Sequence, residues 1–188
     1  MRLFVAVLPP PEALGHLSTA IEGLHVVRAG AGLEPPERWH LTAVFLGETA
    51  DDRLETICAR LAEGAAAGRP ATLALAGGGH FGETVLWTGV DGELDALVRT
   101  VRALRRHLRQ ARVELERRPY RPHLTLARPR ARVTPQQLRD DVATLKSYRG
   151  PSWTADRVHL MRSTQYRTPT GLQAVRYESL ADWPTYQA

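Results

Sequence analysis

The sequence predicts an α+β fold in which mixed sheets carry helices on one side, and three observations support this class. β-Rich runs alternate with segments of helical periodicity, in the order strand, helix, strand, helix, hairpin, helix, strand, helix, strands. The pattern His-Leu-Thr-apolar occurs at residues 40–43 and again at 123–126, each time at the start of an apolar run. The phosphate-binding sequence GxxxxGK followed by Ser or Thr does not occur, and no strand-linked GxGxxG is found, so the nucleotide folds that those motifs mark are not supported.

The first elements are predicted from β-propensity, helical spacing and turn residues. Residues 2–8 are rich in β-forming residues and end at three prolines, which indicates a strand. Residues 12–24 have apolar side chains at helical spacing and are followed by a loop of Gly and Pro at 30–36. A second strand is expected at 39–46, and the acidic pair at 51–52 caps a helix that runs to about residue 67.

The second half of the chain is read in the same way. Residues 71–76 and 84–90 predict a hairpin around a glycine-rich turn at 77–82, which fits a turn better than a phosphate cradle. A long helix is expected at 91–112, and its arginine-rich face is more typical of a solvated surface than of a binding patch. The second His-Leu-Thr strand follows, then a helix that opens at Thr134-Pro135, and late strands at 156–162 and 173–180 with a turn at 166–171 between them.

Composition predicts an ordinary globular protein. With 188 residues, 43% of them hydrophobic, the chain can form one domain or two lobes that share a core. The net charge of +5 is carried almost entirely by arginine, which indicates either a coding bias or an anionic partner. Cys58 is the only cysteine, so no disulfide or thiolate metal cluster is expected. The apolar N-terminal run is too short for a membrane span and lacks the features of a signal peptide, so we expect a soluble, cytoplasmic protein.

The repeated motif carries the predicted chemistry. On a strand, residues i and i+2 share a face, so each motif offers an imidazole beside a hydroxyl. If His40 and His123 face one another across a phosphate, one can take a proton from water while the other protonates the leaving oxygen. The hydroxyls of Thr42 and Thr125 would then donate hydrogen bonds to the non-bridging phosphate oxygens. Such a pair of histidines needs no metal, and the repeat suggests a pseudo-twofold arrangement around a cleft.

These residues resemble those of a known family. The double motif HxTx…HxTx is the signature of the 2H phosphoesterase superfamily, and MRLFVAV, RWHLTAVFLGE, RPYRPHLTLAR and HLMRST…Y are similar to its RNA 2′,3′-cyclic phosphodiesterase branch, historically called 2′-5′ RNA ligase. The resemblance reaches from the first residues to about Tyr177. It implies a single bilobal domain over residues 1–188, in which two antiparallel sheets line a central cleft, helices lie outside, and each lobe contributes one motif.

The resemblance also implies an activity and its participants. The expected reaction is metal-independent hydrolysis of a 2′,3′-cyclic phosphate to the 2′-phosphate, without a cofactor. The expected substrates are RNA ends, such as those of tRNA fragments, or small cyclic nucleotides, and a monomer is expected. The family assigns His123 as the proton acceptor and His40 as the proton donor, although the near symmetry of the two motifs leaves the reverse assignment open.

Four further residues are candidates for contacts with the substrate. The arginine that follows the family's second motif corresponds to Arg128, but strict alternation would turn its side chain away from the cleft unless the strand ends or bulges before it. Phe45 and Tyr120 are candidates for stacking on a base, with burial in the core as the alternative for each. Ser163, in the tail segment, is a candidate contact beside the cleft.

Other functions stay open at this point. The same cleft could join a cyclic end to a 5′-hydroxyl with a 2′-5′ linkage, although hydrolysis should dominate in water. A non-catalytic module that binds RNA or nucleotides would be expected to lack one of the two His-Thr pairs, and both are present. No HxH or HExxH pair occurs, so a zinc site is not expected.

Overall fold

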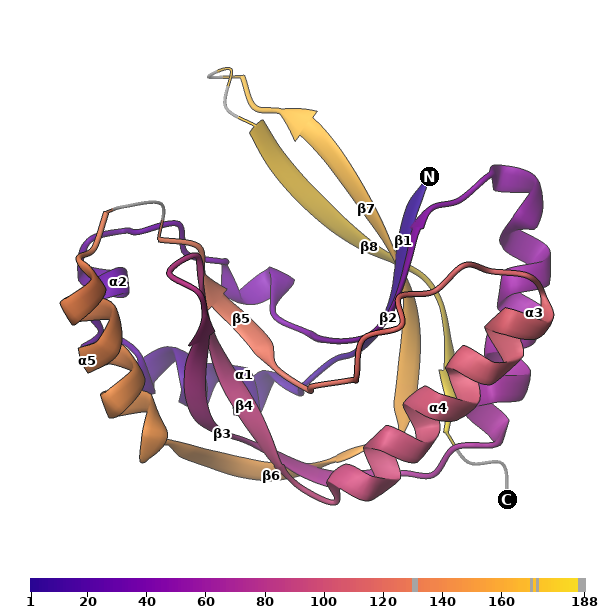
Figure 1. Cartoon of the computed structure of the whole chain (residues 1–188), viewed down its shortest axis with the longest axis horizontal. Coiled ribbons are helices and arrows are strands. Elements are labelled where there is room, and N and C mark those ends of the chain that lie inside the picture. Colours follow the sequence, from indigo (N-terminus) through magenta and orange to yellow (C-terminus); the bar gives the residue numbers. More distant parts are fainter. Residues whose placement is uncertain (130–131, 170, 172, 186–188) are drawn as a thin grey trace.

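The computed structural model describes residues 1–129, 132–169, 171 and 173–185, and shows eight strands and five α-helices (Figure 1). In chain order these are β1 Arg2–Val7, α1 Pro11–Ala20, α2 His25–Arg28, β2 Leu41–Glu48, α3 Leu54–Ala66, β3 Ala71–Phe81, β4 Val85–Gly92, α4 Leu94–Gln110, β5 Leu124–Ala127, α5 Pro135–Lys146, β6 Arg149–Ala155, β7 Arg157–Arg167 and β8 Gln173–Pro184. Short 3₁₀ turns occur at Pro36–Arg38 and Asp51–Arg53.

The described strands pair only antiparallel and form two sheets, as the family resemblance implies, so the mixed sheets expected from the order of elements are not found. One sheet has the order β2-β1-β7-β8 and the other has the order β5-β4-β3-β6. The strands that follow the two His-Leu-Thr histidines, β2 and β5, are each an edge strand of a four-stranded sheet. The α+β class is therefore confirmed, and the two motifs occupy equivalent positions in their sheets.

The helices cover the outer side of the two sheets (Figure 1). Helices α1 and α5 pack on the second sheet, α3 packs on β7 and β8, and α4 lies along α3. Because α1 follows β1 in the chain but packs on β3 and β6, the N-terminal segment joins the two lobes.

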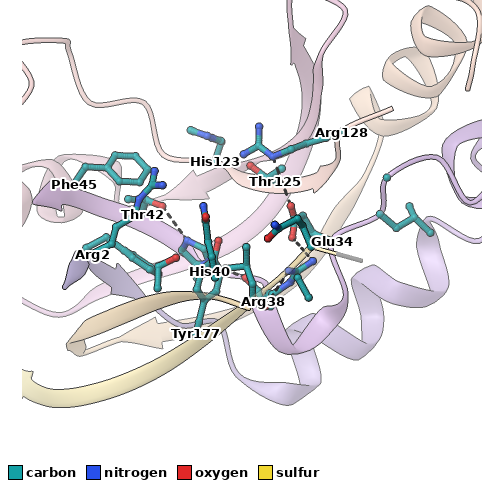
Figure 2. A pocket seen from close by; sticks show the side chains of 18 of the residues that line it. Arg2, Glu34, Arg38, His40, Thr42, Phe45, His123, Thr125, Arg128 and Tyr177 are labelled. Carbon is teal, nitrogen blue, oxygen red and sulfur yellow. Dashed lines mark hydrogen bonds and ion pairs between the residues drawn. The ribbon is translucent and has the colours of Figure 1, made fainter. Parts of the chain in front are cut away.

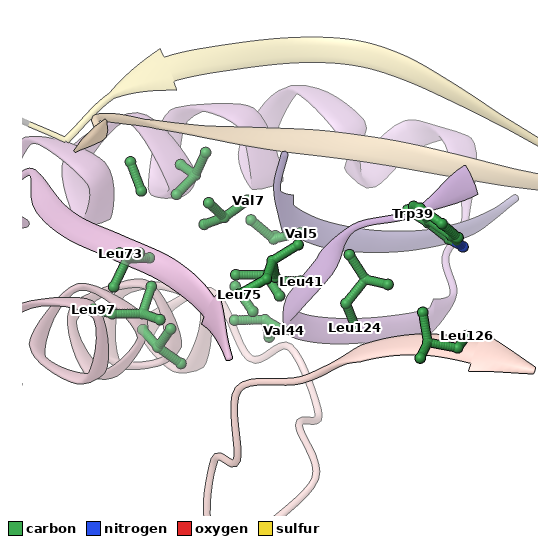
Figure 3. Close-up of a cluster of buried hydrophobic side chains, with 14 of the residues drawn as sticks. Val5, Val7, Trp39, Leu41, Val44, Leu73, Leu75, Leu97, Leu124 and Leu126 are labelled. Carbon is green, nitrogen blue, oxygen red and sulfur yellow. The ribbon is translucent and has the colours of Figure 1, made fainter. Parts of the chain in front are cut away.

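A single cluster of buried side chains contains Val5 and Leu41 from the first sheet and Leu73, Leu75 and Leu124 from the second (Figure 3). Burial of each such side chain contributes about 1.5–3 kcal/mol, so the lobes are held together by a shared core.

Three helices differ from the prediction. The acidic pair at 51–52 lies in a 3₁₀ turn, and α3 begins at Leu54 with no side-chain hydrogen bond at its cap. The helix expected at 12–24 ends at Ala20, and the chain then forms the separate short helix α2. The buried carboxylate of Asp141 accepts hydrogen bonds from the backbone N–H groups of His25 and Val26 at 2.7 and 3.0 Å, which fixes the start of α2 through a residue 115 positions away. The helix expected from residue 91 begins instead at Leu94, because residues 91 and 92 complete β4.

The predicted glycine turn is mostly strand. Residues 78–81 belong to β3, and the chain turns only after Phe81. A Cβ on Gly79 would lie 2.5 Å from the ring of Trp87, and one on Gly78 would lie 2.6 Å from Cβ of Leu145. These glycines therefore serve close packing and not chain reversal.

The late strands also extend beyond the prediction. Strand β6 is not predicted by the sequence because it contains Gly150 and Pro151, yet as an edge strand it tolerates a proline. Strand β7 runs to Arg167 and β8 to Pro184. Residues 166 and 167 of the turn expected at 166–171 belong to β7 because they pair with β8, so the chain reverses only after Arg167, with Thr170 outside the described residues. The helix that opens at Thr134-Pro135 is found as α5, with a capping box between Thr134 and Gln137.

Among the described residues, no helix is both long enough and apolar enough to cross a membrane.

Candidate active site

A cavity of about 800 Å³ separates the two motifs and brings most of the predicted site residues together. His40 and Thr42 line it from one sheet, and His123 and Thr125 line it from the other (Figure 2). Phe45, Arg128 and Ser163 also line it. The two His-Thr pairs therefore meet at one space, although they are separated by 83 positions in the chain.

A β-bulge in β2 shapes the first side of the cavity. Thr42 pairs with Ala6 and Val44 pairs with Val5, so Ala43 is an extra residue with no partner in β1. The extra residue shifts the alternation of faces by one position. Thr42 and Phe45, three residues apart, consequently both line the cavity, whereas Val44 is buried.

The second motif has the same irregularity. Thr125 pairs with Trp87 and Ala127 pairs with Leu86, so Leu126 is the extra residue in β5. Thr125 and Arg128, again three residues apart, both line the cavity. This is the bulge that a contact from Arg128 requires. Because both bulges fall on the fourth residue of their motifs, the two halves repeat one local geometry.

Both imidazoles are held in the same way. His40 Nδ1 lies 2.7 Å from the carbonyl oxygen of Arg38, and His123 Nδ1 lies 2.8 Å from that of Arg121, in each case two residues earlier. A carbonyl oxygen only accepts hydrogen bonds, so Nδ1 carries the proton in each ring. This leaves Nε2 of each histidine as the atom that can exchange a proton. His40 Nε2 lies 3.0 Å from the hydroxyl oxygen of Thr42.

Aromatic side chains pack against each histidine ring. His40 lies between Phe4 and Tyr177, with ring centroids at 4.8 and 5.3 Å. His123 packs against Phe81 at 5.0 Å, edge to face. These contacts restrict rotation of both rings and keep the hydrogen-bonded orientation.

The surroundings of His40 act on its pKa in opposite directions. Burial of the ring lowers the pKa and is the dominant effect. The hydrogen bond to the Arg38 carbonyl and the negative charge of Glu34 raise it, and the neighbouring His123 adds a smaller decrease. The net effect is a pKa below the ordinary value for histidine.

The charge of the cavity suits a phosphate. Among the described residues that line it, four are arginines and one is a carboxylate; they are Arg2, Arg38, Arg128, Arg132 and Glu34. Glu34 lies 2.9 Å from Arg38 and 3.6 Å from Arg128, so it links the two sides of the site (Figure 2). Arginine offers several N–H donors in a fixed plane, which match the oxygens of a phosphate.

The loop that carries Glu34 is fixed to the second motif. The backbone N–H of Glu34 donates to the carbonyl of Leu126 at 2.9 Å, and the N–H of Arg128 donates to the carbonyl of Gly32 at 2.7 Å. Gly32 has φ 62°, and a Cβ there would overlap the carbonyl oxygen of Arg128. Trp39, the residue before the first motif, donates a hydrogen bond from Nε1 to the carbonyl of Glu34 at 2.8 Å. The loop therefore sets the position of one lobe's motif against the other.

Three of the four further candidates for substrate contact lie at the cavity. Phe45 is 52% exposed, so the alternative of burial in the core does not apply to it. Ser163 pairs with Arg2 on the neighbouring strand. Tyr120 is not among the described residues that line the cavity. Its ring packs against the hydrophobic core, and burial raises the pKa of its hydroxyl.

Three residues of the site, Glu34, Arg38 and Tyr177, were not predicted from the sequence. Arg38 stands out in the sequence only as part of a basic and aromatic segment before the first motif, and Tyr177 only as the last residue of the similar tail. Glu34 lies in the Gly- and Pro-rich loop, where the sequence alone does not indicate what the loop approaches. No group of three or more His, Cys, Asp or Glu side chains with metal-binding geometry occurs within the part of the chain that the structure describes.

Comparison with known proteins identifies the family. Residues 9–167 match the family model described as the 2′-5′ RNA ligase superfamily. The chain belongs to this superfamily. It is 32% identical over 159 residues to an RNA 2′,3′-cyclic phosphodiesterase of Geobacillus stearothermophilus, a match that covers 79% of this chain and 46% of that protein. The chain thus spans about half the length of that relative. It is also 32% identical over 149 residues to the protein of the same name from Thermus thermophilus, covering 72% of this chain and 73% of the relative.

Two solved structures show the same fold. The crystal structure of TT0787 from Thermus thermophilus has a TM-score of 0.75 and 27% sequence identity, and the match covers 98% of both chains. Escherichia coli LigT in its apo form has a TM-score of 0.73 at 23% identity, with 99% of this chain and 98% of LigT covered. The arrangement of two antiparallel sheets with outer helices is therefore shared with both proteins.

Proposed function

We propose that this chain hydrolyses the 2′,3′-cyclic phosphate of an RNA end or a nucleotide to the 2′-phosphate, with His40 and His123 as the acid–base pair and without a metal ion. The observation that carries the proposal is the equivalent presentation of two histidines, each with Nδ1 held by a backbone carbonyl, and of the two motif threonines, from opposite sides of one arginine-lined cavity. The activity named for the two relatives agrees with this chemistry.

In the proposed reaction a water molecule attacks the phosphorus and the bond from phosphorus to the 3′ oxygen breaks. His123 Nε2 takes the proton of the water, and His40 Nε2 gives a proton to the departing 3′ oxygen. The ring of His123 is then protonated and that of His40 is neutral, and exchange with solvent restores the starting state. The hydroxyls of Thr42 and Thr125 donate to the non-bridging oxygens, where negative charge develops.

The assignment of His40 as the acid requires that it be protonated when substrate is bound. Burial favours the neutral ring in the free protein, and Glu34 opposes this effect. A bound phosphate adds a second negative charge beside the ring, which raises the pKa further. A cyclic substrate with sulfur in place of the 3′ oxygen distinguishes the proton donor from the proton acceptor, because a thiolate can leave without receiving a proton from a general acid. It should restore activity to His40→Ala and not to His123→Ala; the opposite pattern would reverse the assignment.

The activity itself is tested with a 2′,3′-cyclic mononucleotide in the presence of EDTA, with the product followed by phosphorus NMR. The expected result is a 2′-phosphate formed at the same rate with and without EDTA. Loss of turnover in EDTA that Mg²⁺, Mn²⁺ or Zn²⁺ restores would contradict a metal-independent reaction. Saturable binding without turnover would instead support a nucleotide-binding module. A cytoplasmic location and a monomeric state stay predictions of the sequence.

A further inference from the structure

The outer end of β7 and β8 forms a two-stranded ribbon that projects from the rest of the sheet (Figure 1). Residues of this ribbon line the cavity. Strand β1 pairs with β7 only from His159 to Ser163, where Arg2 is the last partner. Beyond Ser163, β7 pairs with β8 alone, up to the pair of Arg167 with Gln173. This ribbon has two faces, and only one of them is turned to the cavity.

The pairing register of the ribbon determines on which of its two faces each side chain lies. Residues directly opposite one another share a face, and the faces alternate along each strand. Ser163 is opposite Tyr177, Gln165 is opposite Val175, and Arg167 is opposite Gln173. The first two pairs and Gln173 all line the cavity, so this is the inner face. Arg167 belongs to it because it is opposite Gln173.

The outer face has a different composition. Thr164 is opposite Arg176, and Tyr166 is opposite Ala174; of these four residues only Ala174 also lines the cavity. The guanidinium of Arg176 lies 5.4 Å from the centre of the Tyr166 ring, so the two side chains cover one another away from the cavity. Arg167 and Arg176 are both exposed, and no carboxylate of the described residues forms an ion pair with either. They are therefore a matched pair of arginines on opposite faces of one ribbon.

The inner face is suited to an anionic chain that also forms hydrogen bonds. Its side chains are a hydroxyl, two amides, a phenol and the apolar side chain of Val175, with Arg2 at the base and Arg167 toward the tip, and its described residues include no acidic side chain. From Ser163 to Arg167 the strand extends by about 13 Å at the usual rise per residue. At its inner end Tyr177 packs edge-on against His40, so the face continues directly into the proposed catalytic site.

We propose that the inner face of this ribbon binds the RNA chain that leads to the cyclic phosphate, over the nucleotides on the 5′ side of the terminal one. The proposal rests on the proposed function and narrows its substrate class to polynucleotide ends. Arg2 and Arg167 contact backbone phosphates, and Gln165 and Gln173, as amides, donate to and accept from bases and ribose hydroxyls. Arg38 supports the ribbon, because its Nη1 donates to the carbonyl of Val175 at 3.1 Å.

The test compares a 2′,3′-cyclic mononucleotide with a single-stranded oligoribonucleotide that ends in the same cyclic nucleotide. Wild-type protein should have a higher kcat/KM for the oligonucleotide. Arg167→Ala should raise KM for the oligonucleotide about two- to fivefold, the effect of one exposed ion pair, and leave the mononucleotide unchanged. It should also reduce the slope of log KM against log salt by about 0.7. Arg176→Ala, the matched control on the outer face, should change neither quantity.

Two results would overturn this proposal while leaving the proposed function in place. One is an equal kcat/KM for the two substrates in the wild-type protein. The other is an effect of Arg176→Ala as large as that of Arg167→Ala, because this would indicate general attraction between the protein and RNA. Turnover of neither substrate would contradict the proposed function, and the ribbon proposal with it.

Discussion

Phe45 provides a sharp test of how the cavity holds a nucleotide. Its ring lies on the cavity face of β2 because of the bulge at Ala43, and it is 52% exposed. Stacking of a base on an aromatic side chain contributes about 1–3 kcal/mol. Phe45→Ala should therefore raise KM for a 2′,3′-cyclic mononucleotide about 5- to 150-fold. Because half of the ring is already in solvent, the free energy of unfolding should change by less than about 1 kcal/mol.

The assay is steady-state hydrolysis of the cyclic mononucleotide, with stability measured by urea titration. Phe45→Tyr keeps the aromatic ring, so its KM should stay at the wild-type value. Phe45→Leu keeps most of the apolar area but loses the ring, so its KM should rise. Leu33→Ala is a matched control, since Leu33 is another exposed apolar residue that lines the cavity; it should change KM less than Phe45→Ala does. A KM that is unchanged in Phe45→Ala, or fully restored in Phe45→Leu, would refute the stacking argument.

Three further predictions concern the surroundings of the histidines. Glu34→Gln removes a charge that raises the pKa of His40, so NMR titration of the His40 ring should show a lower pKa; an unchanged or higher value would contradict the coupling. Gly32→Ala should lower kcat/KM about 10- to 100-fold with the circular dichroism spectrum retained, because the added Cβ displaces Arg128; wild-type activity would show that the loop tolerates the shift. The free energy of unfolding should fall as the pH drops from 7 to 5, because burial holds the pKa of His40 and of His159 below the ordinary value of about 6.5, so the unfolded chain binds more protons there. This stability is fully present above about pH 6.5 and is lost below it; His40→Asn should show a shallower dependence in urea titrations, and an identical one would contradict this origin.

The two motifs and most of their geometry could be predicted from the sequence. The repeat at 40–43 and 123–126 predicted two strands, two His-Thr pairs and their meeting across a cleft, and the structure places all four side chains at one cavity. The condition stated for Arg128, that the strand must end or bulge before it, is met by the extra residue Leu126. The equivalent bulge at Ala43 was not predicted, because a bulge depends on the register with the partner strand and leaves no local signal.

Elements that depend on distant partners were predicted less well. The break between α1 and α2 reflects the carboxylate of Asp141, which is far away in the chain and caps α2. Gly78 and Gly79 suggested a turn, but close packing against Leu145 and Trp87 demands glycine within a strand. Tyr120 precedes the second motif as Trp39 precedes the first, and both side chains pack with the core and not in the cavity. In each case long-range packing overrides the local pattern.

The most direct measurement of the central claim is kcat/KM for a 2′,3′-cyclic mononucleotide in His40→Ala, His123→Ala and the double variant. His16→Ala, which removes a histidine exposed on α1, serves as the control. Each single variant should lose about 10²- to 10⁴-fold, and the double variant should lose much less than the product of the two, because an acid and a base that act in one step fail together. The control should keep wild-type activity. Full activity in either single variant, with its fold confirmed by circular dichroism, would contradict the two-histidine mechanism.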